Sequence, residues 1–262
     1  MSYLRIADDV AKAIEPVARY IHDAFGTIGL SHSDEKSRHS LFSEVDIGAE
    51  KQLVEVLHSI LPEADFITEE GTVSQQQSDC YWVIDPLDGT TNFLYGIPNV
   101  SISIALKVGG KAVMGIVHHV NRHDTYVAVK GHGATKNNKA IHVSSRTTLE
   151  EAMIATGFPY EVQPFLPTQL RLMEHFIYHS RGVRRLGSAA IDLAYVAEGV
   201  FDLYFEAGLN EWDTSAGMLL VREAGGVCSD LGGDQDYEEG KNIIAATPFM
   251  HRYVLDWLSR HG

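Results

Sequence analysis

Three apolar segments follow one another between residues 100 and 129, and the turns between them are too short to contain a helix. Residues 100–108, 112–120 and 125–129 each have the length and composition of a strand. Gly109-Gly110 joins the first two segments, and residues 121–123 join the second to the third. Parallel neighbours would need a crossover of about a dozen residues or more, so we expect these strands to pair antiparallel. The fold must therefore contain an antiparallel sheet near the middle of the chain, and the other helices and strands must pack around it.

Helical patterns dominate the chain before this sheet. Apolar residues recur at three- and four-residue steps over residues 4–25, which predicts one helix that Pro16 can kink. A polar loop is expected over residues 31–40, and a second helical face runs over residues 45–60. Two short apolar runs, 66–68 and 81–84, are predicted to be strands that stop at acidic residues.

Strands and helices alternate in the second half of the chain. A polar loop is expected over residues 131–139, with strands at 153–156, 200–205, 227 and 243–245 and helices at 170–179, 188–198, 214–224 and 249–258. We therefore predict a single domain over residues 1–262. It has an α+β half over about residues 1–145 and an α/β half over about residues 146–262, packed as one unit.

Acidic residues outnumber basic ones by 35 to 21, and the formal net charge is −14. This balance argues against a nucleic acid or an anionic membrane as partner, because both are bound through Lys and Arg. Two cysteines, Cys80 and Cys228, cannot form a disulfide framework, which favours a reducing compartment. The N-terminal residues lack the apolar core of an export signal, and the run 100–108 is too short to span a bilayer. We predict a cytoplasmic protein.

Two aspartates follow the apolar run 81–84. Asp85 comes directly after it, and Asp88 follows three residues later. Pro86 favours an extended conformation at Asp85, so we expect the strand to end there with Asp85 at its tip. Gly89 and residues 90–92 then suit the start of a short helix, whose free N–H groups can bind an anion. In the alternative interpretation both acids are ordinary turn residues, because Asp is common in turns.

Further acids occupy similar positions. Glu69 and Glu70 close the strand 66–68, either as a solvated charge pair or as ligands at a sheet edge. Asp213 precedes the helix 214–224 and is expected to be its N-cap, which still leaves one oxygen for an ion. Converging carboxylates about 4 Å apart repel one another by about 4 kcal/mol at an effective dielectric constant of about 20. No Lys or Arg lies in these segments, so they predict divalent cations, and oxygen ligands favour Mg²⁺ or Mn²⁺ over zinc.

The sequence around these acids resembles the signatures of the inositol monophosphatase family. Residues 82–93, Trp-Val-Ile-Asp-Pro-Leu-Asp-Gly-Thr-Thr-Asn-Phe, are similar to the first signature. Residues 211–217, Glu-Trp-Asp-Thr-Ser-Ala-Gly, together with 223–226, are similar to the second, and residues 43–46 and 69–71 fit the upstream acidic motifs. The resemblance covers nearly the whole chain. It implies a layered α/β/α/β/α sandwich of the sugar-phosphatase, fructose-bisphosphatase-like type.

The same resemblance implies roles for particular residues. A first metal would be held by Glu69, Asp85 and the Leu87 carbonyl, and a second by Asp85, Asp88 and Asp213, with two or three Mg²⁺ in the site. Thr90 and Asp46, together with Glu69, would position and activate the attacking water. The implied substrate contacts are Asp88, Gly89, Thr90, Thr91, Gly187, Ser188, Ala189 and Glu206. Lys36 lies in the loop that helps complete the site in relatives, but residues 36–42 fit the family pattern poorly.

These features predict Mg²⁺-dependent hydrolysis of a small phosphate monoester by a metal-activated water, with myo-inositol monophosphate as the preferred substrate. The resemblance also implies lithium inhibition and a homodimer. The alternatives are another substrate (fructose 1,6-bisphosphate, histidinol phosphate, NADP or a 3′-phosphoadenosine nucleotide) or a regulatory binding role, since some relatives contact RNA or transcription factors. A basic cluster of Arg181, Arg184 and Arg185 is interpreted as a solvated edge or a dimer contact. His118 and His119, adjacent on a strand, point to opposite faces, so we expect packing roles rather than a shared metal ion.

Overall fold

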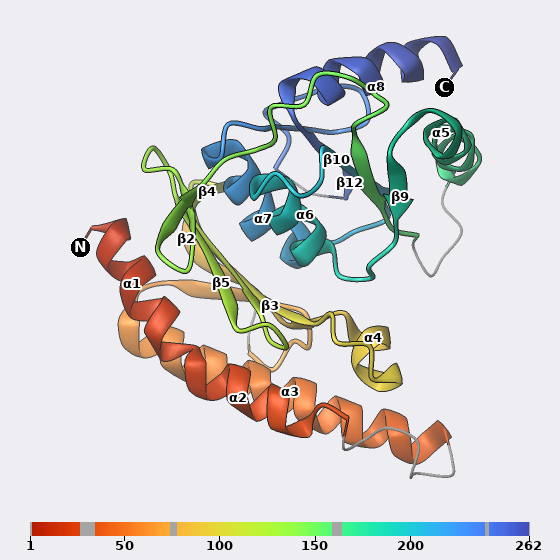
Figure 1. Ribbon diagram of the computed structural model, residues 1–262. Helices are drawn as coiled ribbons and strands as arrows, with labels where there is room; N and C mark the ends of the chain where they lie inside the picture. The colour runs from red at the N-terminus through yellow and green to blue at the C-terminus, as the bar shows by residue number, and fades with distance from the viewer. Residues whose placement is uncertain (1, 27–34, 74–77, 159–163, 239–240, 262) are drawn as a thin grey trace.

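The protein is built from alternating layers of helices and sheets (Figure 1). A computed structural model describes residues 2–26, 35–73, 78–158, 164–238 and 241–261, with the side chains of the third helix described from Glu44 onward. Helices α1 (Tyr3–Ala13), α2 (Glu15–Ala24) and α3 (Glu35–Ile60) cover one face of the first sheet. Helices α6 (Ala189–Ala197) and α7 (Glu211–Glu223) lie between the two sheets, and α5 (Leu166–His179) and α8 (Pro248–His261) cover the second sheet from outside. The predicted α/β/α/β/α order is confirmed.

The first sheet contains the antiparallel strands that the short turns predict. Its order is β1-β2-β3-β4-β5-β6-β7 within the described residues, and only the β1–β2 pair is parallel there. The strands are β1 (Asp65–Thr68), β2 (Cys80–Asp88), β3 (Ser101–Val108), β4 (Lys111–His119), β5 (Asp124–Val129), β6 (Ala134–Lys136) and β7 (Lys139–Ile141). The expectation of an unbroken loop over residues 131–139 was wrong. Asn137 and Asn138 adopt φ of 49° and 63°, which permits a tight turn and lets β6 and β7 pair.

The second sheet is mixed. Its order is β11-β12-β10-β8-β9 in the described ranges, from β8 (Met153–Thr156), β9 (Gly182–Arg184), β10 (Leu203–Ala207), β11 (Val227–Ser229) and β12 (Asn242–Ala246). β10 pairs parallel with β8 and antiparallel with β12. Between the two sheets the chain runs from β7 to β8 without a helix or strand over residues 142–152, and the predicted boundary near residue 145 falls in this connection.

Three apolar clusters separate the layers. One lies between α1–α3 and the first sheet, a second surrounds α6 and α7 between the sheets, and a third lies under α5 and α8. α6 shows why the middle layer holds together: eight of its nine residues are buried, because both sides of the helix face a sheet. None of the described helices is both long and apolar enough to cross a bilayer.

Two helix predictions need correction. The single helix expected over residues 4–25 is two helices, broken at Ile14, because Pro16 lacks an N–H and sits in the first turn of α2. The loop expected over residues 31–40 is helical from Glu35, in a stretch with neither Gly nor Pro, and residues 31–34 lie outside the described ranges. The Lys36 side chain also lies outside the described part of the chain.

The paired histidines of β4 play packing roles. His118 and His119 are both buried, and His118 Nδ1 lies 2.9 Å from Thr125 Oγ1 in a hydrogen bond. Neither histidine belongs to the pocket described below.

Candidate active site

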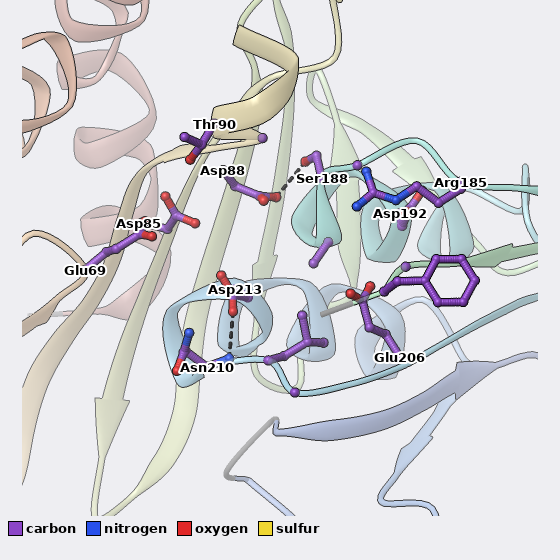
Figure 2. A pocket seen from close by; sticks show the side chains of 17 residues that line it. Glu69, Asp85, Asp88, Thr90, Arg185, Ser188, Asp192, Glu206, Asn210 and Asp213 are labelled. Carbon is purple, nitrogen blue, oxygen red and sulfur yellow. Dashed lines mark hydrogen bonds between the residues drawn. The ribbon is translucent and has the colours of Figure 1, made fainter. Parts of the chain in front are cut away.

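A pocket of about 230 Å³ opens where the two sheets approach each other (Figure 2). It lies at the end of β2, the N-terminal ends of α4 (Thr90–Tyr95), α6 and α7, and the end of β10. Its described wall consists of Glu69, Asp85, Asp88, Gly89, Thr90, Gly157, Phe158, Arg185, Gly187, Ser188, Ala189, Asp192, Glu206, Gly208, Leu209, Asn210 and Asp213. Both halves of the chain contribute, so the site depends on their packing.

A bulge at the end of β2 places two aspartates on the same side of the sheet. β2 does not end at Asp85 as expected but continues to Asp88. Asp85 pairs with Ser103 and Asp88 with Ser101, so three steps along β2 match two steps along β3. In a regular strand, residues three apart point to opposite faces, and the extra residue brings them to the same face. Pro86 has no N–H to offer β3, and the Leu87 N–H donates to Asp85 Oδ1 at 2.9 Å instead.

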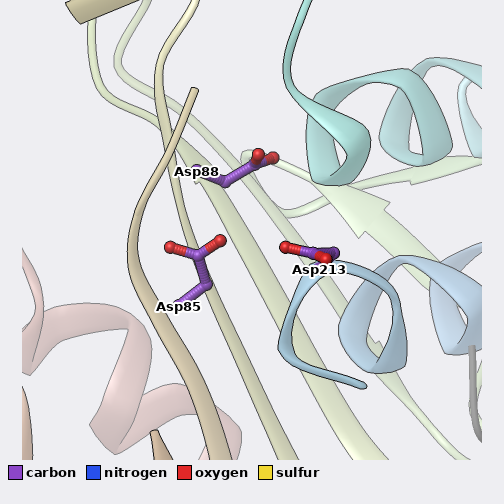
Figure 3. Close-up of side chains that lie close together, drawn as sticks. All are labelled: Asp85, Asp88 and Asp213. Carbon is purple, nitrogen blue, oxygen red and sulfur yellow. The ribbon is translucent and has the colours of Figure 1, made fainter. Parts of the chain in front are cut away.

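Asp213, on α7, places its carboxyl group close to those of Asp85 and Asp88. The helix begins at Glu211, so Asn210 is the N-cap and Asp213 the third helical residue, which corrects the expected N-cap position. Asp213 Oδ2 accepts a hydrogen bond from the Asn210 N–H at 2.6 Å, as an acid at this position often does. Asp85, Asp88 and Asp213 each offer a carboxylate oxygen, and these oxygens lie within 4.8 Å of one another (Figure 3).

Asp88 is held by the start of α6. Its Oδ2 accepts hydrogen bonds from Ser188 Oγ at 2.6 Å, the Ala190 N–H at 2.8 Å and Ser101 Oγ at 3.4 Å. Ser188 also lies 3.0 Å from Ser101, so the two hydroxyls support each other. With one oxygen held in this way, the carboxylate keeps its orientation while contributing its ligand atom to the cluster.

Glu69 lies beside Asp85, and a buried acid of α3 holds the segment that carries it. The carboxyl groups of Glu69 and Asp85 are in hydrogen-bonding contact. Glu50 is fully buried and accepts hydrogen bonds from Thr68 Oγ1 at 2.9 Å and from the N–H groups of Glu70 and Thr72 at 2.8 Å. Sequence reasoning missed Glu50. Its position four residues after Asp46, about one helical turn beyond the acidic motif at residues 43–46, was the available signal.

The acids at this end of the pocket crowd one another. Burial, followed by the charge of Asp88, raises the pKa of Asp213 to about 8. Burial and the charges of Glu69 and Asp88 raise the pKa of Asp85 well above its usual value. Burial also raises the pKa of Asp88, although its hydrogen bonds from Ser188 and Ala190 act in the opposite direction. A cluster of carboxylate oxygens with excess negative charge fits the ligand preference of Mg²⁺.

The residues expected to handle water occupy two different places. Thr90, the first residue of α4, lines the pocket. Asp46 is buried in α3 and does not belong to the described pocket wall. Its carboxyl group hydrogen-bonds to that of Glu70, and burial with the charges of Glu70 and Glu69 raises its pKa to about 9. The paired role of Thr90 and Asp46 stays a prediction.

Two glycines open the pocket wall. Gly89 has φ of 100°, and a Cβ there would collide with the Asn99 carbonyl. Gly187 has φ of 84°, and a Cβ there would press on the Asn92 side chain. Both positions therefore require glycine, which leaves backbone rather than side chain facing the cavity. Asn92 Nδ2 donates to the carbonyls of Asn99 and Leu186, each at 2.8 Å, and so ties α4 to the segment before α6.

Some of the remaining predicted substrate contacts lie in the pocket wall, and others do not. Ser188, Ala189 and Glu206 line the pocket. Thr91 does not belong to its described wall, and the Leu87 side chain is fully buried, so the expected roles of Thr91 and of the Leu87 carbonyl stay predictions.

The end of the pocket farther from the cluster has a different character. Glu206, at the end of β10, accepts a hydrogen bond from Tyr204 Oη at 2.6 Å, and burial raises its pKa to about 7. A Cβ at Gly157 would collide with the Glu206 carboxyl group, so a larger residue there would displace Glu206 from its present position. Arg185 and Asp192 line this end too (Figure 2). Asp192 was missed, and the interpretation of Arg185 as a solvated edge was incomplete, because it is exposed yet its charge acts on Glu206 and Asp192.

Comparison with known proteins places the chain in a family. The sequence model of the inositol monophosphatase family matches residues 4–261. The chain belongs to the inositol monophosphatase family. This confirms the resemblance carried by residues 82–93 and 211–217. Members of this family are Mg²⁺-dependent and bind phosphorylated substrates, so membership supports phosphatase chemistry at the acidic pocket.

Individual relatives agree with this assignment. Nus factor SuhB of Pasteurella multocida is 40% identical over 222 residues, which make up 84% of this chain and 83% of that protein. The crystal structure of extragenic suppressor protein suhB from Bartonella henselae is similar with a TM-score of 0.86 and 33% identity, over 99% of both chains. The inositol monophosphatase of Anabaena (Nostoc) gives a TM-score of 0.85 at 26% identity, over 100% of this chain and 98% of that one.

Proposed function

We propose that this protein hydrolyses a small phosphate monoester with the help of Mg²⁺, and that myo-inositol monophosphate is its preferred substrate. The observation that supports this best is the cluster of Asp85, Asp88 and Asp213, whose carboxylate oxygens approach within 4.8 Å of one another. The folded protein keeps these like charges together, although burial and mutual repulsion raise their pKa values. Divalent cations resolve that conflict, and a phosphate group then has a counter-charge to bind.

The residues divide into two sets of ligands. Glu69, Asp85 and the Leu87 carbonyl would hold one Mg²⁺, and Asp85, Asp88 and Asp213 would hold a second. The proposal includes a third ion as an alternative count and Mn²⁺ as a substitute. When bound, two such ions lower the pKa of a water molecule and neutralise the attacking and leaving oxygens of an in-line displacement.

The rest of the wall would position water and substrate. The Thr90 hydroxyl, which lines the same pocket as Glu69 and Asp85 (Figure 2), would orient the attacking water, with Asp46 supporting it from α3. Backbone groups at Gly89, Thr91, Gly187 and Ala189 would bind the phosphate and the nearby part of the substrate. Ser188 would keep Asp88 in place, and Glu206 would accept a hydrogen bond from a hydroxyl of the substrate alcohol.

A phosphate-release screen tests this proposal. Purified protein is assayed with Mg²⁺ on inositol 1-phosphate, fructose 1,6-bisphosphate, histidinol phosphate, NADP and 3′-phosphoadenosine 5′-phosphate. We expect the highest kcat/KM on inositol 1-phosphate, no activity with EDTA, and inhibition by millimolar lithium. Activity that survives EDTA would contradict the metal-dependent mechanism, and a preference for one of the other esters would reassign the substrate.

A regulatory binding role is a second candidate, because relatives that are 36–40% identical are named Nus factor SuhB. Expression of wild type and of Asp88→Asn in a suhB-deficient bacterium separates the two functions. Rescue by both proteins would favour a binding role that needs no hydrolysis. Rescue by wild type alone would favour the enzyme.

Two further properties are part of the proposal. The exposed apolar residues Leu170, Ile177 and Tyr178 of α5, together with the edge strand β9, support a homodimer through this face. Light scattering after size exclusion measures the mass, and a monomer at micromolar concentration would contradict the homodimer.

Cys80 and Cys228 are free thiols, which supports a reducing compartment such as the cytoplasm.

A further inference from the structure

The far end of the pocket contains a buried carboxyl group with an unpaired oxygen. Asp192 lies in the first turn of α6, is 1% exposed, and lines the pocket. Its Oδ1 has no hydrogen-bond partner among the described residues. A buried polar atom without a partner is destabilising, so such an atom beside a cavity suggests a ligand that supplies the missing hydrogen bond.

Another buried acid shows that the fold can satisfy a carboxylate when its role is structural. Asp202, before β10, is fully buried. Arg146 Nε donates to both of its oxygens, at 3.0 and 2.9 Å, and the Met153 N–H donates to Oδ2 at 2.8 Å. Asp202 therefore has a cation and a backbone donor. Asp192 faces a cavity instead, and this difference separates a structural acid from one that is available to a ligand.

The surroundings of Asp192 define the chemistry of that ligand. Glu206, which comes from β10, acts on Asp192 through its charge, and so does Arg185 with the opposite sign. One of the Glu206 oxygens already accepts a hydrogen bond from Tyr204. Two carboxyl groups on facing elements suit neighbouring hydroxyl groups, which donate to carboxylates. A single Arg beside two acids leaves no surplus positive charge for a second phosphate.

We propose that Asp192 is a specificity-determining residue that, together with Glu206, binds the hydroxyl groups of the substrate alcohol. The pocket then selects a polyol monophosphate over a monoester without further hydroxyls and over a bisphosphate. This inference rests on the proposed phosphatase function and deepens it. Burial raises the pKa of Asp192 above its usual value, and the inference itself rests on the unpaired Oδ1 beside the cavity.

The test compares two substrates on one set of variants. Wild type, Asp192→Ala and Asp192→Ser are assayed with Mg²⁺ on inositol 1-phosphate and on phenyl phosphate, which has no hydroxyl for the far end. We expect kcat/KM on inositol 1-phosphate to fall about tenfold in both variants, mainly through KM, as the loss of one hydrogen bond predicts. Activity on phenyl phosphate should change less than about twofold. Asp192→Ser keeps a polar group in the cavity and serves if Asp192→Ala does not fold.

Asp202→Asn is the matched control, because it alters a buried acid that lies outside the described pocket wall. We expect it to lower stability and to leave the ratio of the two kcat/KM values unchanged. Equal losses on both substrates in the Asp192 variants, or no loss on either, would overturn the inference. Wild type that cleaves phenyl phosphate as well as it cleaves inositol 1-phosphate would overturn the inference and leave the phosphatase chemistry standing. Wild type inactive on both esters would instead refute the proposed function.

Discussion

Two of the places where this protein shields carboxylates from water provide for them differently. Asp202, beside the second sheet, is paired with Arg146 and a backbone N–H. Asp85, Asp88 and Asp213, between the sheets, accept hydrogen bonds from neutral N–H and O–H groups, and their carboxylate oxygens lie within 4.8 Å of one another. The comparison teaches that burial alone does not mark a functional acid. The mark is a set of converging acids that, unlike Asp202, has no ion pair with Lys or Arg among the described residues.

The largest effect should come from Asp88→Asn, which removes one charge from the cluster without changing its volume. We expect turnover to fall at least about 1000-fold, about 4 kcal/mol in the barrier, because a ligand of the proposed second ion is lost. The free energy of unfolding measured in urea with EDTA should stay the same or rise, since one repelling charge is gone. If Asp88→Asn had the turnover of wild type, the clustered acids would have no more part in catalysis than Asp202, and the comparison of the two regions would fail.

Arg146→Ala tests the structural region. It leaves the Asp202 carboxylate buried without its cation, so the free energy of unfolding should fall by about 3 kcal/mol. Specific activity of the folded protein should match wild type, because neither residue belongs to the described pocket wall. The measurement is urea unfolding beside a phosphate-release assay at a temperature where both proteins are folded. A loss of turnover without a loss of stability would contradict the assignment.

Mg²⁺ should stabilise the folded protein only by binding to the clustered acids Asp85, Asp88 and Asp213. At 100 times its dissociation constant, Mg²⁺ should raise the free energy of unfolding by about 2.7 kcal/mol in wild type. The Arg146→Ala protein should gain the same amount, and Asp88→Asn should gain much less. Thermal melts over a Mg²⁺ titration measure this. An equal gain in Asp88→Asn would place the ion elsewhere.

The smallest expected effect is a pH dependence of the metal-free protein. The pKa of Asp213 is about 8 and that of Asp46 about 9 in the folded state, both raised first by burial. Between pH 7 and 8.5 the folded protein therefore holds protons that the unfolded chain has released, so stability falls as pH rises, by about 1 kcal/mol for Asp213 and about 2 kcal/mol for Asp46. The buried His118 and His119, whose pKa values burial lowers, act in the opposite direction only below about pH 6.5.

Urea unfolding in EDTA at several pH values measures this slope. Asp213→Asn should make this slope shallower, and saturating Mg²⁺ should do the same, because the ion keeps its ligand acids deprotonated in the folded protein. A metal-free stability that rises from pH 7 to 8.5 would contradict the crowding of the acids.

Much of the fold follows from patterns that the sequence displays directly. The short turns around Gly109-Gly110 predict the antiparallel sheet, and residues 82–93 carry the family resemblance that the comparison confirms. Helix ends were harder to predict. Asp213 was expected at an N-cap, because Asp favours that position, but Asn210 occupies it.

The missed site residues are acids on buried faces of helices. Asp192 stands within the run Ala-Ala-Ile-Asp-Leu-Ala, and Glu50 stands on the buried face of α3. The single acid in the apolar run of α6 gives no periodic signal, and Glu50 is one of several acids along α3. Its partners, Glu206 for Asp192 and Thr68 for Glu50, lie far away in the sequence or on another element. Tertiary packing therefore decides what such a residue does.

The bulge of β2 has a consequence for how the chain can vary. Deleting Pro86 or Leu87 would give β2 and β3 a regular ladder, and the sheet itself would be better paired. The same deletion would turn one of the two aspartates toward the apolar cluster on the opposite side, since strand side chains alternate. The length of this segment is therefore set by the acids rather than by the sheet. A deletion here would give β2 a regular ladder but would separate the two aspartates of the proposed metal site.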